Sequence, residues 1–260
     1  MSYMPGKRNR GLSVIGSLRH LMSEDKITEE TVNIALLLGW CVEWFQAFFL
    51  VADDIMDQSL TRRGQLCWYK KVAYLTSVGQ SLDLITKPGN DFEHFTLNRY
   101  KVIVKYKTAF YSFYLPVALA MYMAGITDKE AHENAKAILL EMGEFFQIQD
   151  DFLDAYGDPK ITGKVGTDIE ENKCTWLIVN ALERVSPQQL TIIKENYGIN
   201  DQDATLKVKE IYKELGLDKM FHEYEESSYQ KIIDLINTRS GNLPKAVFLE
   251  FVQKIYKRKK

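Results

Sequence analysis

Hydrophobic positions recur every three to four residues along most of the chain, which is the spacing of amphipathic α-helices. Glycine and proline are scarce, at 15 and 6 of 260 residues, and no region shows sustained alternation of β-branched and polar residues. The pattern therefore predicts an almost entirely helical fold. The expected helices span residues 11–22, 28–57, 77–85, 98–125, 129–156, 174–185, 187–197, 203–215, 217–238 and 244–257.

The breaks between these helices are equally informative. Residues 87–91 (Lys-Pro-Gly-Asn-Asp) predict a strong interruption, and Pro116 predicts a kink inside the helix expected over 98–125. Residues 162–168 contain two glycines and form a polar segment that can fold over an anion. No fixed-period repeat or low-complexity linker occurs, so we expect one all-α domain over residues 1–260, an antiparallel helical bundle around a central cavity.

One hydrophobic run is long enough to be compared with a membrane span. Residues 34–52 contain only Glu43 and Gln46 as strongly polar members, and the run is nineteen residues long. Three aspartates follow it directly, at positions 53, 54 and 57. We therefore expect a helix buried on most sides within a soluble bundle and no membrane span.

Composition narrows the class of protein. Apolar residues make up 46% and charged residues 26%, and the net charge of −2 gives no electrostatic reason to expect nucleic acid or an anionic membrane as a partner. The three cysteines, Cys41, Cys67 and Cys174, have no metal-ligand spacing and indicate buried thiols in a reducing compartment. The first ten residues lack the apolar core of a secretory signal. These features favour a cytoplasmic protein.

The chemistry centres on two acid clusters. Asp53, Asp54 and Asp57 end an apolar helix, and the same DDxxD pattern returns at residues 150–154, again after an apolar helical run. Positions one and five of the motif lie one helical turn apart on one face. A single cluster is compatible with a solvated helix end, but clustered carboxylates that recur at two helix ends favour binding of Mg²⁺, which often bridges protein carboxylates and substrate phosphates.

Cations and aromatic residues accompany the aspartates. The basic residues stand at separate positions: Lys7, Arg8, Arg10, Arg62, Arg63, Lys107, Lys164 and Lys173. Together with magnesium-binding carboxylates they indicate a diphosphate site. Phe48 and Phe49 precede Asp53 by about one turn; they are ordinary core residues unless the aspartates hold a diphosphate, in which case they form the floor below its hydrocarbon chain.

Several motifs in order along the chain carry a resemblance to a known family. Residues 6–11, 46–57, 62–64, 105–108, 143–173 and 254–257 resemble the corresponding segments of farnesyl diphosphate synthases, within the trans-isoprenyl diphosphate synthase family. The resemblance extends almost from end to end. It implies a prenyltransferase with the isoprenoid synthase fold, usually a homodimer, that condenses isopentenyl diphosphate with dimethylallyl or geranyl diphosphate to give farnesyl diphosphate.

The resemblance also implies a role for each matching position. Three Mg²⁺ ions would be held by Asp53, Asp57 and Asp150, with Asp54, Asp151 and Asp154 in support. The allylic diphosphate would be bound by Arg62, Lys107, Lys164 and Lys173, and the allylic carbon faced by Thr108 and Gln147. Isopentenyl diphosphate would be bound by Lys7, Arg10, Gln46 and Arg63. Product length would be limited to fifteen carbons by Phe48 and Phe49.

The chain departs from this family in two places, and one of three rival functions follows from these departures. Helical sequence that the family carries is absent near residues 71–72, and the family's helix before residue 6 has no counterpart here. A shortened chain of this kind could be a catalytically impaired isoform or paralogue that acts as a regulatory partner subunit. A class I terpene cyclase shares only the first acid motif, and a calcium-binding structural protein would need a loop pattern that the sequence lacks.

Overall fold

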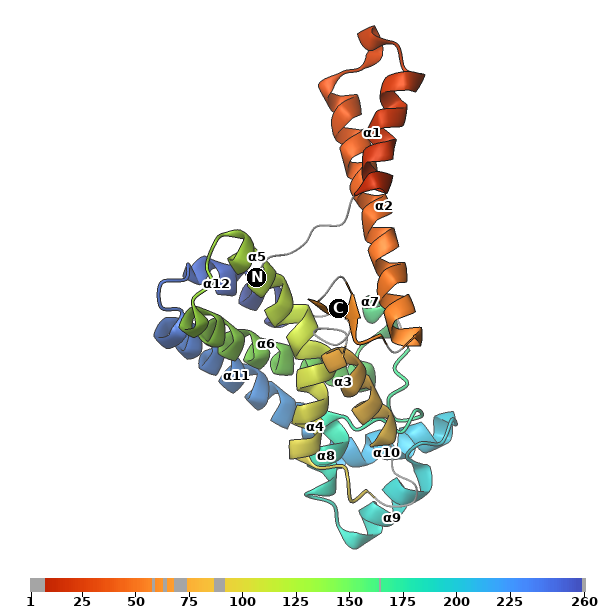
Figure 1. Ribbon diagram of the computed structural model, residues 1–260. Helices are drawn as coiled ribbons and strands as arrows, with labels where there is room; N and C mark the ends of the chain where they lie inside the picture. The colour runs from red at the N-terminus through yellow and green to blue at the C-terminus, as the bar shows by residue number, and fades with distance from the viewer. Residues whose placement is uncertain are drawn as a thin grey trace. The chain divides into compact units, whose positions relative to one another are not determined.

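The computed structural model describes residues 8–57, 59–62, 65–67, 74–86, 92–163 and 165–258, and the chain divides into two compact units, Met1–Tyr74 and Leu75–Lys260 (Figure 1). The described residues are almost all helical, which confirms the predicted all-α class. The expectation of a single domain over residues 1–260, with the two acid clusters around one cavity, stays a prediction.

The first unit is built on a helical hairpin. Helix α1 (Asn9–Leu21) runs beside α2 (Glu29–Met56), and a single 3₁₀ turn (Glu24–Lys26) lies between them in the chain (Figure 1). The two helices meet at glycines: a Cβ on Gly39 would lie 2.7 Å from the carbonyl oxygen of Gly11. The Gly11 N–H also donates to Glu43 Oε1 over 2.8 Å, so this close approach satisfies one of the free N–H groups at the start of α1.

Burial of α2 differs from the prediction. Helix α1 leaves most of the apolar surface of α2 exposed, and the exposed aromatic residues are Trp40, Trp44, Phe45, Phe48 and Phe49. The expectation of a helix buried on most sides is therefore wrong for this segment, because among the described residues of Met1–Tyr74 it is α1 that packs along it. Residues Glu29–Val51 are long and apolar enough to cross a membrane by length and composition alone, which is weak evidence for a span.

A short antiparallel pair of strands, β1 (Thr61–Arg62) and β2 (Gln65–Leu66), follows α2. Thr61 pairs with Leu66 and Arg62 with Gln65. This turn brings Arg62 back toward the end of α2, where the first acid cluster lies.

The second unit contains the remaining helices. They are α3 (Tyr74–Ile85), which begins at the junction, α4 (Leu97–Val104), the π-helix η3 (Lys105–Tyr114), α5 (Leu115–Met123), α6 (Lys129–Tyr156), α7 (Pro159–Thr162), α8 (Trp176–Leu182), α9 (Pro187–Asn196), α10 (Gln202–Glu214), α11 (Leu217–Arg239) and α12 (Lys245–Ile255). The helices predicted from periodicity are confirmed to within a few residues at each end. The break expected at residues 87–91 lies outside the described residues.

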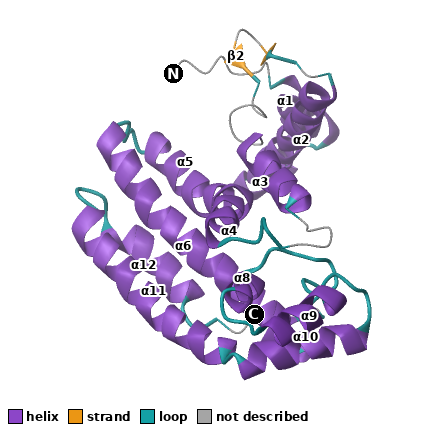
Figure 2. Cartoon of the chain, turned by 90° about the horizontal axis from the view of Figure 1, so that it is seen from below, coloured by secondary structure: helices purple, strands orange, loops and turns teal. Residues whose placement is uncertain are grey.

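Helix α6 is the centre of the second unit, and its neighbours lie along it (Figure 2). Its buried side chains, among them Leu139, Met142 and Phe145, pack with residues of η3, α5, α11 and α12 in one core. A second core surrounds α8 and joins α4, α10 and the start of α11. A long helix packed on several sides is a rigid support, and α6 carries the second acid cluster near its C-terminal end.

The irregularity expected near Pro116 takes the form of a π-helix. Residues 97–123 are continuously helical, but Lys105–Tyr114 has π geometry and the α-helix resumes at Leu115, with Pro116 in its first turn. The backbone hydrogen bonding changes from i→i+5 to i→i+4 just before Pro116. Because proline has no N–H, this change leaves no backbone donor unpaired at that position. π segments within helices are frequent at functional sites, and this one carries Lys107 and Thr108.

Candidate active site

The first acid cluster lies at the end of α2, and its three carboxylates have different surroundings. Asp53 and Asp57 are exposed, whereas Asp54 is buried. Arg62 donates through Nε to Asp54 Oδ1 over 2.8 Å and through Nη2 to Asp53 Oδ2 over 2.9 Å. The hydrogen bond from Arg62 is the main reason why the pKa of Asp54 is lowered below its usual value. Asp54 therefore keeps its negative charge near neutral pH although its side chain is buried.

These contacts define the role that Arg62 can play. Its guanidinium donates hydrogen bonds to Asp53 and Asp54, so in this structure Arg62 holds these two carboxylates in place. A guanidinium has five N–H donors, and the two bonds to Asp53 and Asp54 use two of them. Arg62 can hold the cluster and still contact a phosphate group, as the sequence predicts.

The second acid cluster lies in the last two turns of α6, and its middle residue is again the buried one. Asp151 accepts hydrogen bonds from the Tyr100 hydroxyl at 2.7 Å, the Trp176 backbone N–H at 2.8 Å and Gln147 Nε2 at 3.0 Å. Burial outweighs these bonds and raises the pKa of Asp151 to about 7. Asp151 thus joins α6 to α4 and to the start of α8.

Asp150 and Asp154 flank this buried carboxyl group. Asp150 is partly exposed and lies 3.7 Å from a guanidinium nitrogen of Arg258, at the end of the described chain. Asp154 accepts from the backbone N–H groups of Thr167 and Asp168, at 3.3 and 3.0 Å. Asp154 therefore anchors the glycine-containing loop that the sequence predicts to fold over an anion.

Two of the predicted diphosphate-binding lysines converge on a residue that the sequence did not single out. Lys107 Nζ lies 2.9 Å and Lys173 Nζ 3.1 Å from Oδ2 of Asp83, a buried residue of α3. An isolated acid in an amphipathic helix carries no sequence signal that separates it from a surface acid, so only the fold reveals this contact.

Thr108 and Gln147 form a direct pair. The Thr108 hydroxyl donates to Gln147 Oε1 over 2.7 Å, and Gln147 Nε2 donates in turn to Asp151. Because an amide has both donor and acceptor groups, Gln147 connects η3 to the second acid cluster. The two residues that the sequence predicts to face the allylic carbon are thus held next to each other.

A second acid that the sequence analysis missed is Asp168, which follows the loop glycines. Burial, and then repulsion from Asp151, Asp154 and Asp150, raises the pKa of Asp168 to about 8. The hydrogen bond from the Asp168 N–H to Asp154 over 3.0 Å places Asp168 beside the second cluster. Its place in a glycine-containing loop was the signal available in the sequence.

The other predicted site residues either lie in α1 and α2 or fall outside the described residues. Arg10 is exposed in α1, and Gln46 is half-buried in α2. Phe48 and Phe49 lie one turn before Asp53, with their ring centroids 5.6 Å apart in an edge-to-face arrangement. The remaining predicted residues lie outside the described part of the chain: Lys7, Arg63 and Lys164.

The chemistry of the donor set fits Mg²⁺. Within the described ranges no three potential ligands are already gathered closely enough to hold a metal ion. Asp53, Asp57 and Asp150 nevertheless present hard carboxylate oxygens at the surface, and Mg²⁺ is usually bound through one or two carboxylates with waters and substrate phosphates completing its shell. Each cluster by itself thus offers ligands of the kind that Mg²⁺ shares with a phosphate group.

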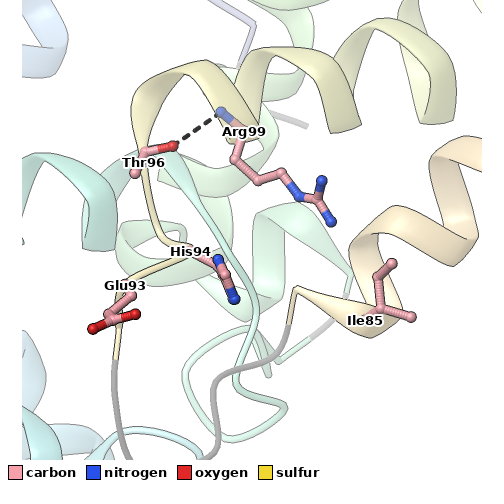
Figure 3. A pocket seen from close by; sticks show the side chains of 5 residues that line it. All are labelled: Ile85, Glu93, His94, Thr96 and Arg99. Atoms are coloured by element: carbon pink, nitrogen blue, oxygen red, sulfur yellow. Dashed lines mark hydrogen bonds between the residues drawn. The ribbon is translucent and has the colours of Figure 1, made fainter.

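Two cavities of the second unit are lined by residues other than the clustered aspartates. One of about 420 Å³ is lined by Ile85, Glu93, His94, Thr96 and Arg99 (Figure 3). Another, of about 450 Å³, lies between α4, α6, α8 and α11. Their linings include no aspartate of either acid cluster. Neither of these two cavities is therefore formed by an acid cluster.

Comparison with known proteins identifies the family. The family model described as polyprenyl synthetase matches residues 1–78 and 70–215. The chain is 53% identical to farnesyl pyrophosphate synthase of Gallus gallus, over 98% of this chain and 81% of the relative, and 51% identical to that of Homo sapiens, over 98% and 71%. The chain therefore belongs to the polyprenyl synthetase family.

Structural comparison agrees with the sequence comparison. T. brucei farnesyl diphosphate synthase complexed with risedronate superposes with a TM-score of 0.70 at 32% identity, covering 98% of this chain and 87% of that one. Within the family, the chain is thus similar to farnesyl pyrophosphate synthases in both sequence and fold.

The alignments also reveal a difference in length. The alignment with the Gallus gallus enzyme extends over 298 positions, at least 38 more than the 260 residues of this chain. The two matches to the family model meet at residues 70–78, next to the division between the compact units at Tyr74 and Leu75.

Proposed function

We propose that this chain is a prenyltransferase that condenses isopentenyl diphosphate with dimethylallyl or geranyl diphosphate to give farnesyl diphosphate. The observation that carries the proposal is the convergence in the second unit of an acid cluster, two paired lysines and the Thr108–Gln147 pair. The relatives named farnesyl pyrophosphate synthase support the same reaction. A cytoplasmic location is proposed with it, which the sparse and odd cysteine count supports.

We further propose that Mg²⁺ is the metal, with three ions expected. Asp53, Asp57 and Asp150 are the proposed ligands, because Asp53 and Asp57 are exposed and Asp150 is partly exposed, whereas Asp54 and Asp151 are buried. When bound, Mg²⁺ supplies positive charge that stabilises a departing diphosphate. Asp54 and Asp151 are buried and bonded to neighbouring groups, so their proposed role is to fix the orientation of the helix ends.

The lysines act on the leaving group. Lys107 and Lys173 would bind the allylic diphosphate, and their charge favours its departure as the carbon–oxygen bond breaks. The double bond of isopentenyl diphosphate attacks the resulting allylic cation, and loss of a proton to the released diphosphate regenerates a double bond. Thr108 and Gln147 would direct polar atoms toward the cation, which stabilises its charge before the new carbon–carbon bond forms.

The second diphosphate would be bound by a separate set of residues. Arg10 and Gln46 belong to α1 and α2, and we propose that they bind isopentenyl diphosphate together with Lys7 and Arg63. Lys164 is proposed to join the cations around the allylic diphosphate. These roles rest on the position of each residue in the family motifs.

Chain length is proposed to depend on Phe48 and Phe49. A helix rises about 1.5 Å per residue, so their backbones lie about 6–7.5 Å before Asp53 along α2. A hydrocarbon chain attached to a diphosphate at Asp53 and extending along this helix would reach the rings. The proposed product is therefore the fifteen-carbon farnesyl diphosphate.

We propose a homodimer as the assembly. The exposed aromatic residues of α2 also favour an alternative function, that of a partner subunit. Trp40, Trp44 and Phe45 are exposed, and the relatives carry at least 38 positions without counterpart here. A chain with an incompletely covered helix could act as a catalytically impaired partner subunit of a full-length enzyme.

A radiochemical assay separates these possibilities. The purified chain is incubated with labelled isopentenyl diphosphate, geranyl diphosphate and Mg²⁺, and farnesyl diphosphate is measured. We expect turnover that EDTA abolishes and that Asp53→Ala and Asp150→Ala each reduce at least 100-fold, whereas the matched control Asp234→Ala on α11 leaves it unchanged. Normal turnover in EDTA would exclude the metal-dependent reaction, and a folded but inactive parent chain would favour the partner subunit.

A further inference from the structure

Asp83 connects two lysines that come from distant parts of the sequence. Lys107 and Lys173 both donate to the same oxygen, Oδ2 of Asp83, at 2.9 and 3.1 Å. Their ammonium nitrogens can therefore be no more than about 6 Å apart. All three residues belong to the unit Leu75–Lys260, and the Asp83 side chain is almost completely buried.

The local packing explains why Asp83 reaches Lys107. Gly79 lies one turn before Asp83 on the same face of α3, and a Cβ there would lie 2.2 Å from the backbone nitrogen of Lys107. The absence of a side chain at Gly79 therefore lets α3 approach η3 closely, and the next turn of α3 brings the carboxylate to the lysine.

Lys173 is also held by its backbone. It precedes the N-cap of α8, and its carbonyl oxygen accepts a hydrogen bond from the Tyr197 hydroxyl over 2.6 Å. Its N–H donates to the carbonyl oxygen of Asp168 over 2.9 Å. With its backbone restrained at both groups, the Lys173 ammonium has two acidic neighbours, the buried Asp83 at 3.1 Å and the exposed Glu171 at 3.7 Å. Asp83 is the nearer of the two and the one that also contacts Lys107.

Two ammonium groups at this separation repel each other unless an anion lies between them. The carboxylate supplies that anion and leaves the trio with one net positive charge. A diphosphate has several oxygens on two phosphorus atoms, so it can contact both lysines if they stay side by side.

We propose that Asp83 is a positioning residue that holds the ammonium groups of Lys107 and Lys173 side by side to receive the diphosphate of the allylic substrate. This inference deepens the proposed function and rests on it for the identity of the ligand. Asp83 acts through the lysines and does not itself contact the reacting atoms.

The charge state of the trio agrees with this role. Burial favours the neutral acid and is the largest single effect, but the hydrogen bonds and positive charges of Lys107 and Lys173 together outweigh it and lower the pKa of Asp83. Burial also disfavours the ammonium of Lys173, but the hydrogen bond to Asp83, together with attraction to Asp83, Glu171 and Asp168, outweighs that effect and raises the pKa of Lys173. Removing the carboxylate leaves the burial in place, so Lys173 then loses its proton at a lower pH than in the parent chain.

The test compares Asp83→Asn with the parent by calorimetric binding of inorganic diphosphate to the full chain, in magnesium-free buffer from pH 7 to 10. We expect the pH at which binding is lost to fall by about one unit, which is a tenfold change in the proton affinity of the lysine. Titration of the probe itself is the same for both chains. The matched control is Glu141→Gln, which removes a carboxylate 2.6 Å from Lys231 in the same unit and should cause no shift.

A steady-state assay with geranyl diphosphate adds a second readout. At pH 7, Asp83→Asn should change KM for the allylic substrate less than threefold but lower kcat at least tenfold, since the lysine charges no longer meet the leaving group in one place. Superimposable pH profiles of the parent and Asp83→Asn would overturn the proposal. If the parent fails to condense the substrates while the pH shift is present, the proposed function fails and the assignment of Asp83 stands.

A second variant covers the case in which Asp83→Asn does not fold. Asp83→Glu keeps the negative charge but moves it by one methylene group. It should keep the parent's pH profile for diphosphate binding while lowering kcat at least threefold. Unchanged kcat in Asp83→Glu would contradict a positioning role.

Discussion

Substituting Gly143 by alanine tests how tightly α6 must approach η3. A Cβ on Gly143 would lie 2.3 Å from the Cβ of Ala109 and 2.5 Å from its Cα. Carbon atoms in contact are normally about 3.5–4.0 Å apart, so the two helices would have to separate by about 1–1.5 Å. Helix propensity alone predicts the opposite outcome, because alanine is favoured over glycine within a helix by about 1 kcal/mol.

The magnitude follows from these two effects. Overpacking in a close-packed interior costs about 1–3 kcal/mol, which exceeds the gain in helix propensity. The net change is a loss of about 1 kcal/mol of unfolding free energy, equivalent to a melting temperature lower by about 2–4 °C in a chain of this size. The separation also affects the Thr108–Gln147 hydrogen bond of 2.7 Å, because Thr108 adjoins Ala109 and Gln147 lies one turn from Gly143. A displacement of about 1 Å there should lower kcat by about 10–100-fold.

The assay pairs thermal unfolding with turnover of geranyl diphosphate. Gly16 in α1 provides the matched control, since a Cβ at that position would meet no atom within 4 Å. Gly16→Ala should leave turnover unchanged and should not lower the melting temperature. If Gly143→Ala melts at or above the parent temperature with normal kcat, the close packing of α6 against η3 does not constrain the site and the reasoning fails.

Three further predictions concern individual contacts. Tyr100→Phe removes one of the hydrogen bonds to the buried Asp151 and should lower the free energy of unfolding by about 1–3 kcal/mol in urea titrations; an unchanged midpoint would contradict the role of that bond. Phe48→Ala combined with Phe49→Ala should lengthen the product beyond fifteen carbons, and chromatography that finds the same longest product would show that the rings are ordinary packing residues. Arg63→Ala should weaken isopentenyl diphosphate binding more than allylic binding in separate calorimetric titrations, and equal losses would refute the assignment to distinct sites.

Local sequence signals were sufficient to predict most helices. The helix expected over residues 129–156 is observed with those bounds, because the Asp128 side chain accepts from the Ala131 N–H and caps its start, and Gly157 follows its end. Both signals act within a few residues, so they need no knowledge of the fold. The same reasoning could not detect the π-helix Lys105–Tyr114, because its apolar spacing does not distinguish i→i+5 from i→i+4 hydrogen bonding.

Tertiary features of the site were beyond the sequence analysis. Lys107 and Lys173 are far apart in the chain, and each alone resembles a surface lysine; their common contact with Asp83 depends on how α3, η3 and the segment before α8 pack. Burial of α2 was predicted from its composition, but an apolar sequence specifies a preference for burial and not the element that provides it. The cysteines illustrate the same limit, since Cys67 and Cys174 are buried as expected whereas Cys41 is exposed.

The DDxxD motif divides its carboxylates in the same way in both units. Adjacent residues of a helix point about 100° apart, whereas the first and fifth positions of the motif lie on one face. If the first aspartate faces solvent, the second must therefore point toward the flank of the helix. Asp53 and Asp54 show this division, with side chains 57% and 3% exposed, and Asp150 is likewise partly exposed beside the buried Asp151.

The partners of the second position explain why it is an aspartate. Asp54 is bonded to Arg62 from β1, and Asp151 to Tyr100 of α4 and to the backbone of Trp176. In each unit the buried carboxylate links the end of its helix to another segment of the chain. This link fixes the orientation of the helix end, and with it the direction of the exposed neighbouring aspartate. Because a ligand that is already oriented loses less entropy on binding, the buried aspartate can strengthen metal binding by the exposed one without contacting the metal.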